Sequence, residues 1–373
     1  MKMLMFDFRD SEKDFFDKNK FPDFDITFIK EPLNEMSQLT QEQYDETDVI
    51  SVFISSNVCG EVLKRFKNIR IVATRSTGYN HIDVKHCSQN NIAVFNVEEY
   101  GQTSVAQFTM TLIMALVRNL FPAYLDVQRN YVNHADYEGR NLNKLTLGII
   151  GCGAIGSAVA KLANLMGMKV VVNSYSKRAD VAGFADYLTL EEVLEQSDVI
   201  SLHLPYTTEN YHMIGEKEFA KMKDGAYFVN TARGELIDIV ALYENLLNGK
   251  FKGVALDVLE CEYLALASEN IVEDIRGRNT NCVASALITQ KLLGMPNVII
   301  TPHIAYNTQE SVDTLLETTF NNIRDYNKGF RNNQICWNLP HPNPLLLGEG
   351  IFLSQQNPLF PKLLRKNYID FAF

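Results

Sequence analysis

Two side chains in the second half of the chain have the chemistry that a carbonyl reduction needs. Arg233 follows a run of small residues, and its planar guanidinium can bind a carboxylate through two hydrogen bonds while it stays charged. His303 follows a Thr-Pro turn, and because histidine titrates near neutral pH it can give a proton to a carbonyl oxygen and take it back. A surface arginine and a structural histidine are the ordinary alternatives. Together the two residue types suit a substrate with a 2-oxo carboxylate.

A glycine-rich turn in the middle of the chain predicts a dinucleotide site. Residues 145–150 have the pattern of a buried strand and residues 157–166 that of a helix with one apolar face, so the glycines between them lie at a strand-to-helix turn. In the pattern G-x-G-x-x-G the first glycine permits the tight turn, the second lets the backbone approach a pyrophosphate, and the third lets the helix pack on the strand. The N–H groups at the start of the helix then face the phosphates, whereas a plain tight turn is the alternative. The candidate contacts are Gly151, Gly153, Ala154, Ile155 and Gly156.

The composition is that of a globular protein with room for two domains, each with its own core. The chain has 373 residues, of which 46% are hydrophobic and 21% are charged. A net charge of −10 gives no basic surface for nucleic acid or for an anionic membrane. The six cysteines include no C-x-x-C pair, which favours reduced thiols over disulfides or a metal site. The same cysteine pattern leads us to expect no metal. Charged residues come too early in the chain for a secretory signal, so we expect a cytoplasmic protein.

The elements that must position these residues alternate between short strands and helices, which indicates parallel α/β sheets. The predicted strands span residues 1–8, 25–29, 49–54, 69–73, 92–97, 145–150, 169–173, 198–202, 226–230, 253–257 and 298–300. The predicted helices include residues 61–66, 103–120, 157–166, 190–196, 216–222 and 237–248. The helix 103–120, capped by Thr103 or Ser104, has apolar residues at helical spacing and is expected in the core or at an interface. Loops at the carboxyl ends of strands bind ligands in such sheets, so the loop with Thr77 and Gly78 is a candidate anion site, with an ordinary turn as the alternative.

Six segments in this order resemble the D-isomer-specific 2-hydroxyacid dehydrogenase family over roughly residues 1 to 338, and the D-lactate dehydrogenase branch is the most similar one. The segments are Arg75 to Asp83, the glycine-rich turn, His203-Leu204-Pro205, Asn230 to Gly234, Leu256 to Glu262 and Thr301 to Tyr306. The resemblance implies an α/β fold with two Rossmann-like, doubly wound domains and a cleft between them. It implies a substrate domain at residues 1–98 plus 299–338 and a dinucleotide-binding domain at 99–298. It also implies a homodimer, for which the helix 103–120 is the first candidate surface.

The resemblance assigns roles to single residues as well. It implies that Glu262 binds the imidazole of His303 and fixes its tautomer, and that Asp257 binds the nicotinamide carboxamide. The implied substrate contacts are Thr77, Gly78, Tyr100, Arg233, His303 and Tyr306. The implied cofactor contacts, beyond the glycine-rich turn, are Thr103, His203, Pro205, Thr231, Ala232, Arg233 and Asp257. Without the resemblance, Asp257 could cap a helix, Glu262 could be a solvated carboxylate, and the tyrosines could be core residues.

The implied reaction is the reduction of a 2-oxo acid, expected to be pyruvate, to the D-2-hydroxy acid by a nicotinamide cofactor, together with its reverse. A glyoxylate/hydroxypyruvate dehydrogenase or a phosphoglycerate dehydrogenase is the alternative within the family. A dinucleotide-sensing binding protein, similar to the transcriptional corepressors of the family, is the alternative from another class.

Two parts of the chain depart from the family pattern. The strand 169–173 is followed by Ser174, with no carboxylate there to bind the ribose 2′-hydroxyl of NAD. Lys177 and Arg178 come next and could hold the 2′-phosphate of NADP, so Ser174 and Arg178 are candidate cofactor contacts and NADP is as plausible as NAD. An ordinary basic loop is the alternative. Residues 339–373 contain several prolines and no helical periodicity, which indicates an irregular extension rather than a domain.

Overall fold

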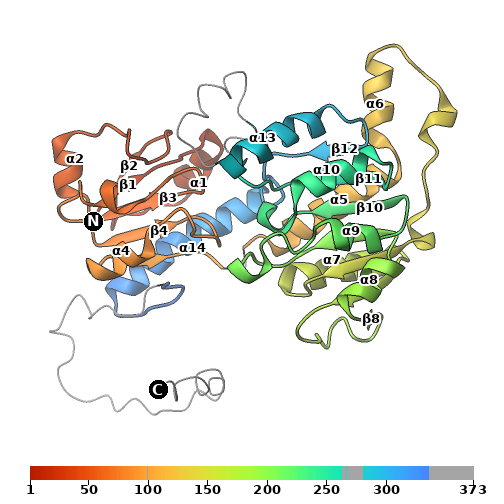
Figure 1. Cartoon of the computed structure of the whole chain (residues 1–373). Helices are drawn as coiled ribbons and strands as arrows, with labels where there is room; N and C mark the ends of the chain where they lie inside the picture. Colours follow the sequence, from red (N-terminus) through yellow and green to blue (C-terminus); the bar gives the residue numbers. More distant parts are fainter. Residues whose placement is uncertain (99, 263–265, 267–279, 336–373) are drawn as a thin grey trace, which may run out of the picture.

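The computed structural model describes residues 1–98, 100–262, 266 and 280–335. These residues form two lobes, each built on one parallel sheet with helices on both faces (Figure 1). The predicted fold class is therefore confirmed. The ends of the predicted strands and helices differ from the observed ones by up to three residues. The predicted irregular extension, 339–373, lies outside the described residues.

The smaller lobe contains five parallel strands in the order β2-β1-β3-β4-β5. The strands are β1 (Lys2–Met5), β2 (Asp25–Phe28), β3 (Val49–Val52), β4 (Ile71–Thr74) and β5 (Ala93–Phe95). β3 and β4 are buried along their whole length, which explains why their sequences are mostly apolar. The chain winds in opposite directions from β1 and from β3, so a ligand crevice is expected at the carboxyl ends of these two strands.

The larger lobe contains seven parallel strands in the order β12-β11-β10-β9-β6-β7-β8. The strands are β6 (Thr146–Ile150), β7 (Lys169–Asn173), β8 (Ala185–Tyr187), β9 (Val199–Leu202), β10 (Ala226–Asn230), β11 (Phe251–Leu256) and β12 (Val298–Ile300). The winding direction changes between β6 and β9, and the glycine-rich turn follows β6 at this point. Sheets of this kind bind ligands in the crevice at such a position.

Helices cover both faces of each sheet. In the smaller lobe they are α1 (Lys13–Lys18), α2 (Gln41–Glu46), α3 (Gly60–Leu63), α4 (Val84–Gln89) and α14 (Gln309–Asn327). In the larger lobe they are α5 (Gln102–Val117), α6 (Leu120–Gln128), α7 (Ala154–Leu165), α8 (Leu190–Gln196), α9 (Glu216–Lys221), α10 (Ile239–Leu247) and α13 (Thr280–Leu293). α5 and α7 pack on one face of the larger sheet, and α8, α9, α10 and α13 pack on the other.

α5 begins one residue earlier than predicted, and the predicted cap at Thr103 or Ser104 is wrong. The residue before the helix is Gly101, which has no side chain to offer as a cap. The hydroxyl of Ser104 instead lies 2.9 Å from that of Thr308 and 2.7 Å from that of Ser311, at the start of α14. Ser104 therefore joins the two lobes. Most of α5 is buried within this chain, so it is a core helix rather than a free surface.

The chain returns to the smaller lobe after β12. Because β12 pairs with β11, residues 299 and 300, which the sequence analysis placed in the substrate domain, belong to the larger sheet. α14 then packs against β4 and adds Phe320, Ile323 and Tyr326 to the core of the smaller lobe. Segments from both ends of the described chain therefore build this lobe.

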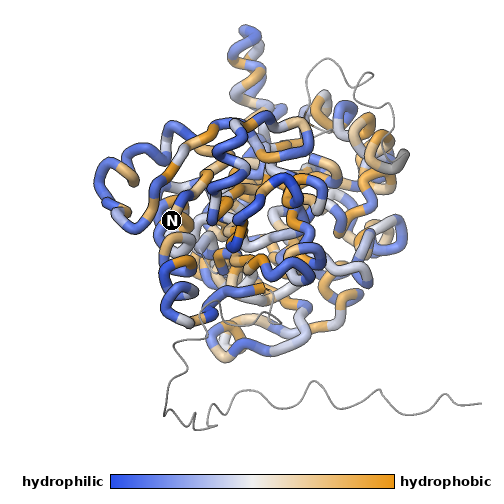
Figure 2. The backbone as a smooth tube through the Cα atoms, turned by 90° about the vertical axis from the view of Figure 1, so that its left-hand side faces the viewer, coloured by the Kyte–Doolittle hydropathy of each residue, from blue (hydrophilic) through white to orange (hydrophobic). Residues whose placement is uncertain are grey.

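Residues 120–144, which we call the arm, project from the larger lobe in two perpendicular views (Figures 1 and 2). The arm consists of α6 and two short 3-10 turns, His134–Tyr137 and Leu142–Lys144. Its exposed apolar side chains are Leu120, Phe121, Tyr124, Leu125, Val127, Tyr131 and Val132. In the described part of the chain, no single helix is long and apolar enough to span a membrane; α5 and α6 reach that length only as a pair bent by 64°.

Candidate active site

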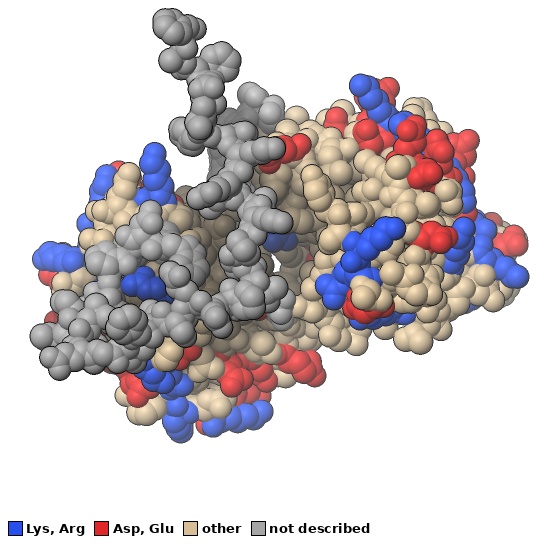
Figure 3. Space-filling view, turned by 90° about the horizontal axis from the view of Figure 1, so that it is seen from below, with Lys and Arg blue, Asp and Glu red and all other residues tan. Residues whose placement is uncertain are grey.

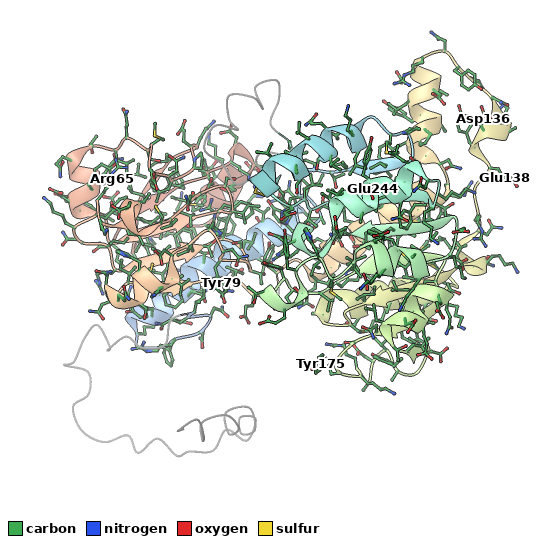
Figure 4. All side chains as sticks on the ribbon, in the orientation of Figure 1. Arg65, Tyr79, Asp136, Glu138, Tyr175 and Glu244 are labelled. Atoms are coloured by element: carbon green, nitrogen blue, oxygen red, sulfur yellow. A yellow bond between two sulfur atoms is a disulfide. The ribbon has the colours of Figure 1, made fainter. Side chains whose placement is uncertain are left out.

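The predicted site residues follow the carboxyl ends of strands from both sheets. Figure 3 shows a hollow between the two lobes. Tyr79, beside the predicted contact Gly78, lies where the smaller lobe borders the larger one (Figure 4). From the smaller lobe come Thr77 and Gly78 after β4 and Tyr100 after β5. From the larger lobe come Arg233 after β10, Glu262 after β11, and His303 and Tyr306 after β12.

The glycine-rich turn has the shape that a pyrophosphate needs. Gly151 has a φ of 94°, and a Cβ at this residue would lie 2.6 Å from the carbonyl oxygen of His203, so only glycine fits. A Cβ at Gly153, by contrast, would meet nothing within 4 Å, so the space beside the turn is open. Gly153 also precedes α7 without a side-chain cap, which leaves the N–H groups of Ala154 and Ile155 at the start of the helix available to a phosphate. The residues present therefore fit a dinucleotide.

The third glycine of the turn, Gly156, lets α7 approach the strand. A Cβ there would overlap the carbonyl oxygen of Gly151, so a larger residue would push the helix away from β6. The mechanical roles that the pattern predicts for Gly151, Gly153 and Gly156 therefore match the geometry of the turn.

The loop after β7 places Ser174 against this turn and gives Arg178 a partner of its own. The hydroxyl of Ser174 accepts a hydrogen bond from the N–H of Cys152 at 3.2 Å. Arg178 Nε lies 3.1 Å from Asp180 Oδ1, and Lys161 Nζ lies 2.6 Å from Asp180 Oδ2. Hydrogen bonds from Arg178 and Lys161 hold the pKa of Asp180 well below its usual range. The guanidinium predicted to bind a 2′-phosphate is thus already paired with a carboxylate.

His203 forms part of the wall beside the glycine-rich turn. Its Nε2 lies 2.9 Å from the hydroxyl of Ser201, and burial lowers the pKa of His203 to about 3. The imidazole is therefore neutral at physiological pH and adds no positive charge to the cofactor site. Pro205, two residues further, is exposed.

The turn after β10 brings Arg233 next to the smaller lobe. Asn230 brackets this turn, because its side-chain oxygen accepts from the N–H of Ala232 at 2.9 Å and its amide donates to the carbonyl of Arg233 at 2.8 Å. A Cβ at Gly78 would lie 3.2 Å from Arg233 Nη2, so the loop after β4 reaches the guanidinium. Two substrate contacts predicted on opposite lobes, Gly78 and Arg233, are therefore neighbours.

The loop after β12 presents His303 to Glu262. Nδ1 of His303 lies 2.9 Å from Oε2 of Glu262, whose other oxygen accepts a hydrogen bond from the N–H of Leu259 at 3.2 Å. A carboxylate at Nδ1 favours a proton on that nitrogen and stabilises the charged imidazole, which carries a second proton on Nε2. The contact between Glu262 and His303, which the sequence alone could not show, is present.

Asp257 fixes the loop that carries His303. The residue is 1% exposed, and its carboxylate accepts hydrogen bonds from Thr301 Oγ1 at 2.6 Å and from the N–H groups of Ile304 at 3.0 Å and Ala305 at 2.9 Å. Burial raises the pKa of Asp257, and these hydrogen bonds oppose that rise. The resemblance implies a contact with the nicotinamide for this residue. The structure gives its carboxylate a further task, which is to hold the backbone on both sides of the histidine.

Aromatic rings form the wall beside His303, and two members of this wall were not predicted. The ring centroid of Tyr306 lies 6.4 Å from that of His303, 6.0 Å from that of Tyr100 and 5.6 Å from that of Phe53. Arg9 Nη1 donates to the hydroxyl of Tyr306 at 2.8 Å, and the guanidinium lies 4.7 Å from the centroid of Phe53. Arg9 follows β1 and Phe53 follows β3, at the change of winding direction in the smaller sheet. The rule that ligands bind at this position, applied to the first sheet, would have indicated both residues.

The other predicted contacts lie around this centre. Thr77 and Thr103 are exposed, and the hydroxyl of Thr77 donates to the carbonyl of Val97 at 2.8 Å. Thr231 and Ala232 are buried in the turn before Arg233. The hydroxyl of Thr231 lies 2.9 Å from that of Thr109 on α5, so this side chain ties the turn to the core.

The cysteines differ from the expectation of reduced thiols. Cys261 and Cys282, which are 21 positions apart in the sequence, form a disulfide. Their spacing gave no signal, because a loop and the start of α13 bring the two sulfur atoms together. Cys59, Cys87 and Cys152 are not part of a disulfide. Among the described residues, no group of three or more His, Cys, Asp or Glu side chains is placed to hold a metal ion.

Residues 110–305 match the family model of the NAD-binding domain of the D-isomer-specific 2-hydroxyacid dehydrogenases. An aromatic 2-oxoacid reductase from Clostridium sporogenes is 36% identical over 294 residues, which are 78% of this chain and 86% of the relative. A D-lactate dehydrogenase from Lactiplantibacillus plantarum is 30% identical over 331 residues, which are 87% of this chain and 96% of the relative. The crystal structure of D-lactate dehydrogenase from Aquifex aeolicus with NAD and lactic acid matches with a TM-score of 0.77 and 34% identity, and it covers 90% of this chain and 99% of that one.

These matches agree with the geometry of the site. A guanidinium for a carboxylate, an imidazole paired with a carboxylate, and a turn shaped for a pyrophosphate lie at the same sheet edges. That combination can pass a hydride and a proton between a dinucleotide and a 2-oxo acid. The chain therefore belongs to the D-isomer-specific 2-hydroxyacid dehydrogenase family and is an NAD-dependent oxidoreductase of D-2-hydroxy acids.

Proposed function

We propose that this enzyme reduces pyruvate to D-lactate. Arg233 binds the carboxylate of pyruvate through its two-pronged guanidinium, and the backbone at Gly78 closes the same end of the substrate. The glycine-rich turn would hold NADH, which would supply the hydride when bound. His303 gives the proton from Nε2 to the carbonyl oxygen, while Glu262 stabilises the charged imidazole through Nδ1. The reverse reaction uses neutral His303 as the base.

The choice of pyruvate rests on the packing of the aromatic wall. Tyr306 and Phe53 are 6% and 4% exposed, and their rings contact each other beside His303. Tyr100 closes the third side, and the hydrogen bond from Arg9 holds Tyr306 in place. A methyl group fits next to such a packed wall, whereas a phenyl ring would have to displace part of it. The wall therefore favours a substrate with a small side chain.

Steady-state kinetics with pyruvate and phenylpyruvate test this proposal. We expect kcat/KM to favour pyruvate by on the order of tenfold to two-hundredfold, the discrimination that a packed apolar pocket gives. Phe53→Ala removes one ring of the wall and is expected to shift the preference toward phenylpyruvate. A parent enzyme that prefers phenylpyruvate would show that pyruvate is the wrong substrate, although the reaction class would stand.

Replacing Glu262 by glutamine is expected to move the pH profile of pyruvate reduction to lower pH. Reduction needs the protonated imidazole of His303, so activity is present at low pH and is lost as the pH rises. Without the negative charge at Nδ1, the charged imidazole that donates the proton loses a stabilising partner. The alkaline limb of log kcat/KM is expected to move to lower pH by about one unit. On the alkaline side of the limb, this shift lowers kcat/KM about tenfold. An unchanged alkaline limb in a folded variant would contradict the pairing of Glu262 with His303.

We also propose that the cofactor site prefers NAD and accepts NADP weakly. The residue at position 174 is serine, so no carboxylate there repels a 2′-phosphate. The guanidinium of Arg178, which could bind that phosphate, is however hydrogen-bonded to Asp180. Ser174→Asp is expected to lower kcat/KM with NADPH by about tenfold to a hundredfold and to retain activity with NADH. Asp180→Asn frees Arg178 and is the reciprocal control, because it is expected to raise activity with NADPH. If neither change alters the ratio of NADPH to NADH activity, the loop after β7 does not contact the 2′-position.

A homodimer formed through the arm is the last part of the proposal. The arm carries exposed apolar side chains away from the body of the protein, and such a surface gains free energy when a second copy covers it. Tyr124→Asp combined with Leu125→Asp is expected to give monomers in sedimentation equilibrium. Tyr175→Asp, at a fully exposed residue at the opposite end of the larger lobe (Figure 4), is the control and is expected to leave the mass unchanged. A dimer that survives the double substitution would place the interface elsewhere.

A further inference from the structure

The loop that carries Glu262 is attached to the protein on both sides of Cys261. Before it, Glu260 faces away from the active site and accepts hydrogen bonds from the hydroxyl of Tyr211 at 2.8 Å and from that of Ser285 at 3.1 Å. After it, Glu262 faces His303. Cys261 therefore sits at the point where the loop changes direction between a structural carboxylate and the one at the active site.

Helix α13 supplies the other half of each attachment. Cys282 and Ser285 are three positions apart, so they lie on the same side of the helix. Ser285 binds Glu260, and Cys282 binds Cys261 through the disulfide, with a Cα–Cα distance of 5.6 Å. α13 itself is fixed to the core of the larger lobe, because Ala286 is fully buried within it. The disulfide thus ties the residue next to Glu262 to a rigid element.

The backbone at Cys261 is in a conformation that its side chain disfavours. Its φ is 55°, in the left-handed region that glycine adopts most easily. The side chain of Glu262 is 31% exposed, and its carboxylate contacts only His303 and the N–H of Leu259 among the described residues. Its backbone carbonyl accepts a hydrogen bond from the N–H of Leu266 at 3.1 Å. The cross-link at Cys261 adds a covalent restraint at the residue next to Glu262.

We propose that the Cys261–Cys282 disulfide is a redox-sensitive positioning element that holds Glu262 against His303. The proposal rests on the catalytic roles given above to these two residues. When the bond is intact, Glu262 stabilises the charged imidazole. When it is reduced, the strained turn at Cys261 relaxes and Glu262 moves away from His303. The activity of pyruvate reduction at alkaline pH then decreases.

The chemistry is thiol–disulfide exchange with a small or protein dithiol. The attacking thiolate of the dithiol forms a mixed disulfide with one cysteine and expels the other as a thiolate, and the second thiol of the dithiol then releases the first cysteine. The protein gains two electrons and two protons, and the dithiol becomes a disulfide. The reverse step takes glutathione disulfide as the oxidant, which leaves as two glutathione thiols.

The readout is the pH profile, because a purely structural cross-link would change stability without moving it. The groups that face His303 are Glu262 from the loop after β11, Asp257 beneath its backbone, and Tyr306 from its own loop. Of these, only Glu262 lies next to a cysteine of the pair. A shift of the alkaline limb on reduction therefore reports on Glu262.

The experiment compares the full-length enzyme after treatment with glutathione disulfide and after treatment with dithiothreitol. Thiol trapping and mass spectrometry measure the fraction of Cys261 joined to Cys282. In the oxidised enzyme we expect the bond. After reduction we expect the alkaline limb of kcat/KM for pyruvate to move to lower pH by about one unit, which lowers kcat/KM about tenfold on the alkaline side of the limb. Cys282→Ser is expected to show the reduced profile under both conditions. Cys59→Ser, a substitution of a free cysteine in the smaller lobe, is expected to behave like the parent.

Cys261→Gly separates strain from the cross-link. Glycine removes both the sulfur and the backbone strain, so this variant is expected to be insensitive to dithiothreitol and to fold at least as stably as the reduced parent in thermal unfolding. Two free thiols in the glutathione-treated enzyme, or identical pH profiles before and after reduction, would overturn the inference. An oxidised, folded enzyme without any activity toward 2-oxo acids would instead overturn the proposed function.

Discussion

Replacing His303 by glutamine is expected to lower kcat/KM for pyruvate reduction by about a hundredfold to ten-thousandfold, the usual contribution of a general acid. Glutamine keeps a polar side chain of similar size, but it cannot give a proton to the carbonyl oxygen. The contact with Glu262 would no longer involve a charged partner. The decrease should therefore appear in kcat, measured from the nicotinamide absorbance, while the affinity for NADH stays close to that of the parent.

A matched substitution shows that the loss is local. His86→Gln changes a histidine on α4, far from the loop after β12, and is expected to keep the activity of the parent. A His303→Gln enzyme that retains more than a tenth of the parent activity would show that another group, or water, supplies the proton.

Arg233→Lys is expected to lower kcat/KM by an amount that corresponds to roughly 2–4 kcal/mol of transition-state stabilisation, the loss that accompanies a charged, two-pronged hydrogen bond. Lysine keeps the charge but offers a single point contact to the carboxylate. It also leaves the carbonyl of Ala232, to which Arg233 Nη1 donates at 2.6 Å, without this partner. Because the contact binds substrate before and during the reaction, we expect KM for pyruvate to rise as well as kcat to fall.

Arg65→Lys provides the comparison for this substitution. Arg65 also uses its guanidinium for several hydrogen bonds, but it lies on the smaller lobe away from the site (Figure 4). Its substitution is expected to change stability slightly and kcat/KM hardly at all. A loss of less than tenfold in Arg233→Lys would mean that another residue anchors the carboxylate.

The architecture could be predicted well from the sequence, because buried strands need apolar residues and therefore have a recognisable sequence pattern. β3, β4 and β9 are buried along their whole length, and each appears as a run of mostly apolar residues between turn signals. The glycine-rich turn was equally readable, since Gly151 and Gly156 have no room for a side chain. In these places, local packing alone dictates the residue type.

Other parts of the site depend on contacts between side chains of different segments or loops. The sequence around each residue gives no sign of such contacts. The pairing of Arg178 with Asp180 depends on how the loop after β7 folds back. The position of Arg9 depends on Tyr306, nearly three hundred residues later in the chain. The start of α5 was misplaced for the same reason, because Ser104 binds α14 rather than capping its own helix.

The division of the smaller lobe between both ends of the chain has a consequence for synthesis on the ribosome. Its sheet is complete once β5 has been made, but one face is only partly covered until Phe320, Ile323 and Tyr326 of α14 emerge. The larger lobe is continuous in sequence and can fold as a unit during that interval. We therefore expect the nascent chain to acquire its cofactor site before its substrate site, with an exposed apolar sheet face in the meantime that is a natural target for chaperones.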